Sequence, residues 1–153
     1  MYPPERLAMT PRISSRSWRR KGCWYRMQTD MPAIRLYAQV AWELLRYDLL
    51  FRCRGLEGVR PREAARPGTA DADRQRQICQ ALRSIAPFYW KPIRCLQRAI
   101  VTARIMRRHK IPAEVVIGFR AAPFFSHAWV EVEGRVANDS PAYQARLLVL
   151  ERF

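Results

Sequence analysis

The sequence has few residues of the kinds that build metal sites, and it lacks a long apolar run. Its four cysteines contain no Cys-x-x-Cys pair, and its two histidines, His109 and His127, form no zinc-type spacing. We therefore expect no metal and no other cofactor. No apolar stretch of about 7–15 residues follows the N-terminal basic residues, which argues against a signal peptide. Charged residues interrupt the most apolar segment, 32–54, so we expect no membrane span and a cytoplasmic protein with free thiols.

The charge of the chain is predominantly positive. The chain has 28 Lys and Arg against 13 Asp and Glu, which gives a net charge of +15, and only three of the basic residues are lysines. Residues 91–110 hold seven basic side chains and no acid. This balance is typical of proteins that bind nucleic acid, an anionic membrane or an acidic peptide, and it does not choose among them. A basic binding module without catalysis is therefore one hypothesis, and its binding would weaken steeply with salt.

The length of 153 residues predicts one domain. Residues 1–30 are basic and lack hydrophobic periodicity, so we expect a mobile arm. Trp18, Trp24 and Tyr25 within it could stack on bases, but nucleic acid is not the partner that we favour. Residues 31–153 are expected to form the domain, with a helical part over 31–86 and a core over 87–153.

Apolar spacing predicts helices first and strands second. One helix is expected over 32–54, where the apolar stripe runs through Ile34, Tyr37, Ala38, Ala41, Leu44, Leu45 and Leu49. A Gly/Pro-rich linker over 55–72 follows, then a helix over about 72–85 and a third from near Pro92 to Pro112. Strands are expected over 113–120 and 126–133, and a turn at Glu133-Gly134 pairs the second with 135–139. The fold class predicted is α+β, with N-terminal helices followed by a small antiparallel sheet.

Three residues could combine into a nucleophilic site. Cys95 is expected in the first turn of the third helix, where backbone N–H groups and the neighbouring Arg94 and Arg98 favour a thiolate. His127 and Asp139 fall nearly opposite each other in the predicted hairpin. His127 could then take the Cys95 proton while Asp139 holds its other nitrogen. Each residue also has an ordinary structural alternative: Cys95 as a buried thiol, His127 as a packed core histidine and Asp139 as a turn residue.

The sequence around these residues resembles a known family. Its motifs are Cys95-Leu-x-Arg98, Arg-Arg-x-x-Ile-Pro-Ala over 107–113, Ile-Gly-Phe-Arg over 117–120, Ser-His-Ala-Trp-Val-Glu-Val-Glu-Gly-Arg-Val over 126–136, and Asn138-Asp139. Together they resemble the lasso-peptide biosynthesis B2 proteins, stand-alone leader peptidases of the transglutaminase-like, papain-like cysteine-protease superfamily. The similarity runs from about Trp90 to the C-terminus and more weakly through 33–54.

The resemblance implies a cysteine peptidase that separates the leader of a ribosomally made precursor peptide from its core. Cys95 would be the nucleophile, His127 the general base and acid, and Asp139 the orienting acid. The expected partners are the precursor, a separate leader-binding protein and the lasso cyclase. The Cys95 backbone N–H is one expected oxyanion donor, with Trp90 or Gln97 considered for the second. An acyl-transferring enzyme of the same fold is the alternative. Residues 91–110, which contain no acid, also suggest a basic face around Arg104 and Arg108 that docks the leader bound to its leader-binding protein.

Overall fold

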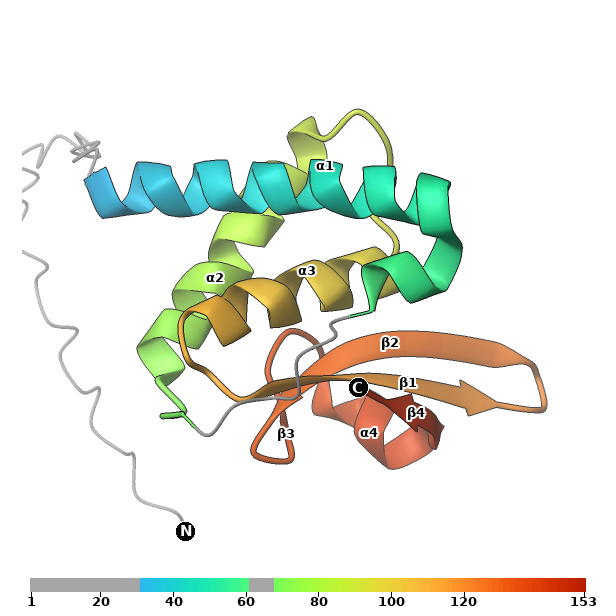
Figure 1. Cartoon of the computed structure of the whole chain (residues 1–153). Helices are drawn as coiled ribbons and strands as arrows, with labels where there is room; N and C mark the ends of the chain where they lie inside the picture. The colour runs from blue at the N-terminus through green and yellow to red at the C-terminus, as the bar shows by residue number, and fades with distance from the viewer. Residues whose placement is uncertain (1–30, 61–67) are drawn as a thin grey trace, which may run out of the picture.

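The computed structural model describes residues 31–60 and 68–153. The arm predicted for 1–30, and residues 61–67 of the predicted linker, lie outside the described residues. Three helices precede the strands, as predicted, and a fourth lies between the last two strands (Figure 1). The elements are α1 (Met31–Val59), α2 (Ala72–Ile85), the 3-10 turn η1 (Ala86–Phe88), α3 (Cys95–Arg108), β1 (Ala113–Arg120), β2 (Phe125–Val132), β3 (Arg135–Val136), α4 (Pro141–Arg146) and β4 (Leu148–Arg152). The α+β class is confirmed.

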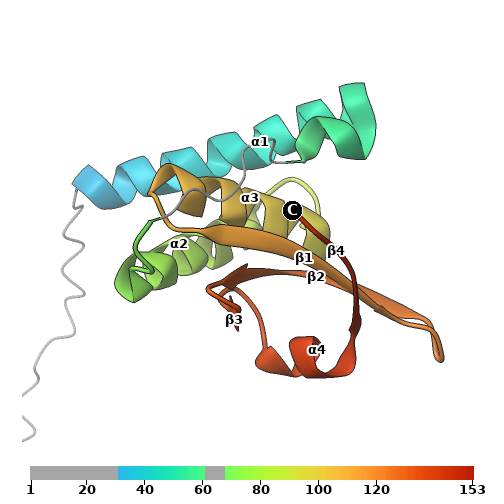
Figure 2. The ribbon, with the colours of Figure 1, turned by 60° about the horizontal axis from the view of Figure 1, so that its bottom comes forward.

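The elements form layers. Within the described residues, the strands make one antiparallel sheet in the order β3-β2-β1-β4. α3 packs on β1 and β2, and α1 and α2 pack on α3. Turning the molecule shows α1 as the outermost layer on this side and α4 on the opposite side of the sheet (Figure 2). α3 is therefore held between the other helices and the sheet, and its first residue is Cys95.

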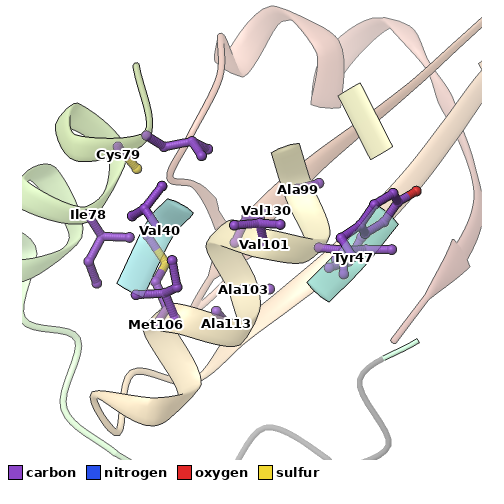
Figure 3. Close-up of a cluster of buried hydrophobic side chains, with 14 of the residues drawn as sticks. Val40, Tyr47, Ile78, Cys79, Ala99, Val101, Ala103, Met106, Ala113 and Val130 are labelled. Carbon is purple, nitrogen blue, oxygen red and sulfur yellow. The ribbon is translucent and has the colours of Figure 1, made fainter. Parts of the chain in front are cut away.

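The main core lies between the helices and the sheet (Figure 3). It joins Val40 of α1, Ile78 of α2, and Val101 and Met106 of α3 to Val130 of β2. Side chains of β2 alternate between the two faces of the sheet, since Ala128, Val130 and Val132 belong to this core and Trp129 to a second cluster on the other face. The second cluster contains Val116, Trp129 and Leu147 and packs against Tyr143 of α4.

The side of α1 that faces the core is opposite to most of the apolar stripe that the spacing identified. Five apolar residues of α1 are buried in the core: Leu36, Val40, Leu44, Tyr47 and, near the end of the helix, Val59. Of the predicted stripe, Leu44 is buried, whereas Ile34, Tyr37, Leu45 and Leu49 are exposed. The physical reason is that α1 is apolar on two opposite sides, so that periodicity alone cannot select which side is covered.

The predicted stop at Gly55 is a break within α1, which continues to Val59 over residues that were predicted to be linker. Gly55 has φ 62° and ψ −151° within α1, so the helical path breaks there before a short further turn ends at Val59. Glycine occupies this positive-φ region without the steric cost that a side chain would bring.

The strands differ from prediction after Val132. The expected pairing of 126–133 with 135–139 contains only two pairs, Glu131 with Val136 and Val132 with Arg135. The main partner of β2 is instead β1, in a register that places Gly118 opposite His127. α4 and β4 were not predicted. They matter for the site because α4 follows Asp139 directly and carries Tyr143.

Candidate active site

Cys95 begins α3. The preceding residue, Arg94, is extended, with φ −80° and ψ 160°, and its carbonyl accepts the first helical hydrogen bond from the Arg98 amide at 2.9 Å. The Cys95 N–H therefore belongs to the first turn, where amide groups have no acceptor within the helix and carry partial positive charge. The side chain is partly buried and packs against the main core. This is an environment in which a reactive thiol can be both shielded and reached.

His127 and Asp139 lie in contact. The imidazole Nε2 is 2.9 Å from Asp139 Oδ2, and the two side chains are only 11% and 16% exposed. Tyr143 covers the imidazole ring with its centroid 4.1 Å away. Because Nε2 is engaged by the carboxylate, Nδ1 is the ring nitrogen left to exchange a proton with another group.

The route to this contact is not the predicted ladder. Pairing with β3 stops at Val136, and the chain is then held to β2 by two bonds to Val130. The Ala137 amide donates to the Val130 carbonyl at 2.9 Å, and the buried Asn138 Oδ1 accepts the Val130 amide at 2.8 Å. The side chain of Asn138 thus supplies the hydrogen bond that the main chain of a further strand pair would have made. The next residue, Asp139, lies beside His127.

Arg98 contacts the acid of the pair. It was predicted to favour the Cys95 thiolate, but its Nη2 donates to Asp139 Oδ2 at 2.9 Å. The Ser140 amide donates to the other oxygen, Oδ1, at 2.9 Å. Burial alone would raise the pKa of Asp139, but the hydrogen bonds from His127 and Ser140 and the charge of Arg98 lower it below its ordinary value. Asp139 is therefore ionised at neutral pH, and Arg98 ties α3, one turn after Cys95, to the His127–Asp139 pair.

The structure thus brings together two of the three predicted residues. Among the described residues, Cys95 Sγ makes no hydrogen bond with His127 or Asp139. Its connection to them is through Arg98 and through the packing of α3 on β2. The catalytic roles of all three residues remain predictions.

A second polar cluster surrounds Asp48 of α1. Tyr89 Oη donates to Asp48 Oδ2 at 2.6 Å, and Lys91 Nζ and the buried Gln97 Nε2 donate to Oδ1 at 2.7 and 3.1 Å. Burial first, and then the hydrogen bond to Asp48, raise the pKa of Tyr89 to about 12. The cluster fixes the segment before Cys95 against α1. Sequence reasoning missed it because its members come from α1, from the segment before α3 and from α3 itself.

The residues considered for the second oxyanion donor are placed differently from each other. Gln97 already donates to Asp48 through its amide nitrogen. Trp90 is 73% exposed, and Lys91 Nζ lies 5.0 Å from its ring centroid. Neither side chain has a geometry that marks it as the donor, so the Cys95 amide remains the one that the fold favours.

The predicted basic docking face is wrong for Arg104. Arg104 and Arg108 both form ion pairs with Glu43 of α1, which is fully buried. The Arg104 side chain is only 10% exposed, and its Nη2 also donates to the Val59 carbonyl at 2.8 Å. Lys91 and Arg98 are engaged by Asp48 and Asp139. Much of the acid-free segment 91–110 therefore neutralises acids of other elements within the domain, and Arg104 is not available to a partner.

The described ranges also bear on metals and membranes. No group of three or more His, Cys, Asp or Glu within residues 31–60 and 68–153 could hold a metal ion. In the same ranges, no helix combines the length and apolarity that crossing a membrane requires.

Comparison with known proteins agrees with this fold. A family model described as the transglutaminase-like superfamily matches residues 35–152. This is well over half of the chain, and the protein therefore belongs to the transglutaminase-like superfamily.

A second comparison points to a particular relative. Over 56 residues the chain is 45% identical to the microcin J25-processing protein McjB of Escherichia coli. The aligned stretch is 37% of this chain and 27% of McjB, so it spans about a quarter of the length of that relative. No solved structure matches the chain. The resemblance to lasso-peptide B-type proteins and to the transglutaminase-like superfamily is confirmed.

Proposed function

We propose that this protein is a cysteine peptidase that removes the leader from a ribosomally synthesised lasso precursor peptide. The observation that carries the proposal is the His127–Asp139 hydrogen bond, formed through Nε2 and tied by Arg98 to the helix that begins at Cys95. Membership of the transglutaminase-like superfamily supports acyl-enzyme chemistry, and the similarity to a microcin-processing protein supports a precursor peptide as substrate. A separate leader-binding protein would deliver the leader, and a cyclase would use the released core.

The three residues would divide the chemistry as follows. His127 Nδ1 takes the proton of the Cys95 thiol, and the thiolate attacks the carbonyl carbon of the bond between leader and core. Asp139 holds Nε2, fixes the ring orientation and stabilises the imidazolium that forms. Tyr143, whose ring is tilted by 30° against the imidazole with the centroids 4.1 Å apart, restricts its rotation further. The base is therefore oriented before the substrate arrives.

The remaining steps use the same groups. The tetrahedral oxyanion is stabilised by the Cys95 amide at the positive end of α3. His127 then gives its proton to the nitrogen of the core peptide, the C–N bond breaks, and the leader remains on Cys95 as a thioester. His127 then takes a proton from water, and the resulting hydroxide attacks the thioester. The C–S bond breaks, the leader leaves as a carboxylic acid, and His127 returns the proton to the Cys95 thiolate.

Acyl transfer is the second candidate function. It shares every step up to the thioester and differs only in that an amine, not water, attacks it. Superfamily membership alone favours this function as much as it favours hydrolysis. The two are distinguished by the product, since hydrolysis adds the mass of water to the leader and transfer adds the mass of an amine.

The decisive experiment is mass spectrometry of a precursor incubated with its leader-binding protein and either wild type or Cys95→Ala. We expect one cut between leader and core with wild type and none with the variant. Cys53→Ala is the matched control, because Cys53 is an exposed free cysteine on α1 and should be dispensable. Equal cleavage by wild type and Cys95→Ala would overturn the assignment of the nucleophile. If the cognate precursor were cut by neither, the proposal of a peptidase would be wrong.

A further inference from the structure

The outer side of α1, opposite its core-facing side, carries a stripe of exposed apolar residues. Its large members are 51% (Ile34), 38% (Tyr37), 62% (Trp42), 52% (Leu45) and 64% (Leu49) exposed. Ala38 and Ala41 lie between them on the same side. We call these seven residues the outer stripe. A helix that is apolar on both sides is normally covered on both, and a contiguous exposed patch of this kind marks an interaction site.

The outer stripe is the free surface of the outermost layer. Figure 2 shows α1 as the outermost layer, lying across α2 and α3. Tyr37, at the edge of the stripe, also lies near α2, where it lines a pocket with Arg74 and Gln77. The stripe extends from Ile34 to Leu49, which is roughly 22 Å at 1.5 Å per helical residue. It therefore offers about four turns of helix, enough length for a well-packed contact with one segment of a partner.

The shape of the stripe favours a helix as the occupant. Ala38 and Ala41 near its middle are small, whereas Tyr37, Trp42 and Leu45 around them are large. Large and small side chains that alternate along a helix form the ridges and grooves by which a second helix packs.

The charges beside the stripe indicate the chemistry of that helix. The exposed charged side chains that border the stripe are all basic: Arg35, Arg46 and Arg52, of which Arg46 also contacts Glu43 at 3.3 Å. The two acids between residues 33 and 54 are engaged within the domain, Glu43 by arginines and Asp48 by Tyr89, Lys91 and Gln97. A second copy of the chain would bring like charges together, whereas a partner with Asp and Glu bordering its apolar face would be complementary.

We propose that the outer stripe docks an amphipathic helix of the separate leader-binding protein, with apolar residues of that helix on the stripe and acidic residues beside its arginines. The inference rests on the proposed function for the existence of this partner. It goes further by assigning the surface and the chemistry of the contact. The binding side lies on α1, so the partner can be held without covering the His127–Asp139 pair, which lies on the sheet.

The test is the affinity of the leader-binding protein for variants of the full chain, measured by isothermal titration calorimetry. Leu45→Glu and Leu49→Glu place a carboxylate in the apolar contact and should each raise the Kd at least tenfold. Leu150→Glu is the matched control: Leu150 is 66% exposed on β4, close to the 64% of Leu49, but lies away from the stripe. The control should bind like wild type. Leu49→Lys should weaken binding less than Leu49→Glu, because the partner is acidic.

Folding and chemistry are checked on the same variants. The positions are exposed, so thermal unfolding and the rate at which iodoacetamide alkylates Cys95 should match wild type. Partner-dependent leader removal should fall in parallel with affinity. If Leu45→Glu and Leu49→Glu bind and cut like wild type while Cys95→Ala is inactive, the peptidase stands and the docking surface is wrong. If Leu45→Glu and Leu49→Glu lose binding but neither the wild type nor any variant cuts the precursor, the docking surface is supported and the peptidase is wrong.

Three other results would overturn the inference. One is a wild-type dimer in analytical ultracentrifugation that Leu45→Glu dissociates while the affinity for the partner stays unchanged, since the occupant would then be a second copy. Another is binding of the wild type to vesicles of phosphatidylcholine and phosphatidylglycerol that Leu45→Glu and Leu49→Glu abolish while their affinity for the partner stays unchanged, since the occupant would then be a membrane surface. The third is equal weakening by Leu49→Lys and Leu49→Glu in a salt-independent manner, which would contradict the acidic border.

Discussion

Replacing Glu43 by glutamine should lower the free energy of unfolding by about 3–5 kcal/mol, the cost of removing one partner from a buried ion pair. Glu43 is fully buried, and its carboxylate accepts Arg46 Nη1 at 3.3 Å and lies against Arg104 and Arg108. Glutamine keeps the shape of the side chain and removes only its charge. The loss therefore measures the electrostatic role of this acid and not a cavity.

The magnitude follows from the burial of Arg104. Its side chain is 10% exposed, and burial lowers the pKa of the guanidinium while the charge of Glu43 raises it. Without Glu43, Arg104 keeps its bond to the Val59 carbonyl but has a buried charge that no acid balances. Arg46 provides the control, because its side chain is 43% exposed and Arg46→Gln should cost at most about 1 kcal/mol.

Urea unfolding followed by circular dichroism measures both variants. Equal losses for Glu43→Gln and Arg46→Gln, or a loss below about 1 kcal/mol for Glu43→Gln, would refute the reasoning. The result also matters for the surface of the protein. A large loss of unfolding free energy means that Arg104 and Arg108 stabilise the packing of α1 on α3. A negligible loss would mean that they are free to bind a partner.

Three further substitutions, at Asp139 and Gly118, probe the site itself. Asp139→Ala should reduce leader removal at least about 100-fold in a kinetic assay, while Asp139→Asn should retain more activity because its amide oxygen still accepts the His127 bond. The lowered pKa of Asp139 means that its stabilisation is present above the unfolded pKa, near 3.8, and is lost as the pH falls through the folded value. Acid titrations of unfolding should therefore be shallower for Asp139→Asn than for wild type, and identical curves would contradict this assignment. Gly118→Ala should lower the free energy of unfolding by about 1–3 kcal/mol in urea, because the new Cβ would meet the Trp129 ring at 2.6 Å and Leu147 Cβ at 2.9 Å. Its strand position opposite His127 predicts a parallel loss of activity, and unchanged stability would show that the ring can move away.

Local signals in the sequence were sufficient for α1, α2 and α3 and for the break at Gly55. They were insufficient for choosing the buried side of α1, because both sides are apolar and the choice depends on α2 and α3 packing against it. The buried Glu43 illustrates the same limit. It reads as an ordinary helix charge until Arg104 and Arg108, more than fifty residues later, are placed beside it.

The site was foreseen in part for reasons that the sequence contains. Cys95 at a helix start follows from the prolines and the apolar spacing, and the nearness of His127 to Asp139 follows from the turn at Glu133-Gly134. The roles of Arg98 and Tyr143 could not be read in this way. Arg98 lies in the same turn as Cys95, and only the tertiary fold shows that it reaches Asp139 instead. Tyr143 lies on a six-residue helix whose packing against β2 is long-range.

The position of β1 in the sheet has a consequence for how the protein is made. β1 pairs with β2, the next strand of the chain, and on its other edge with β4, which arrives only after α4. The final bonds on that edge join the main chain of Val115 to Phe153 at 2.8 and 3.1 Å. During synthesis this edge therefore stays open until 148–153 have left the ribosome, although Val115 and Val116 are fully buried in the finished fold. An apolar strand with an unpaired edge recruits other strands, so a nascent or truncated chain lacking β4 is a template for aggregation.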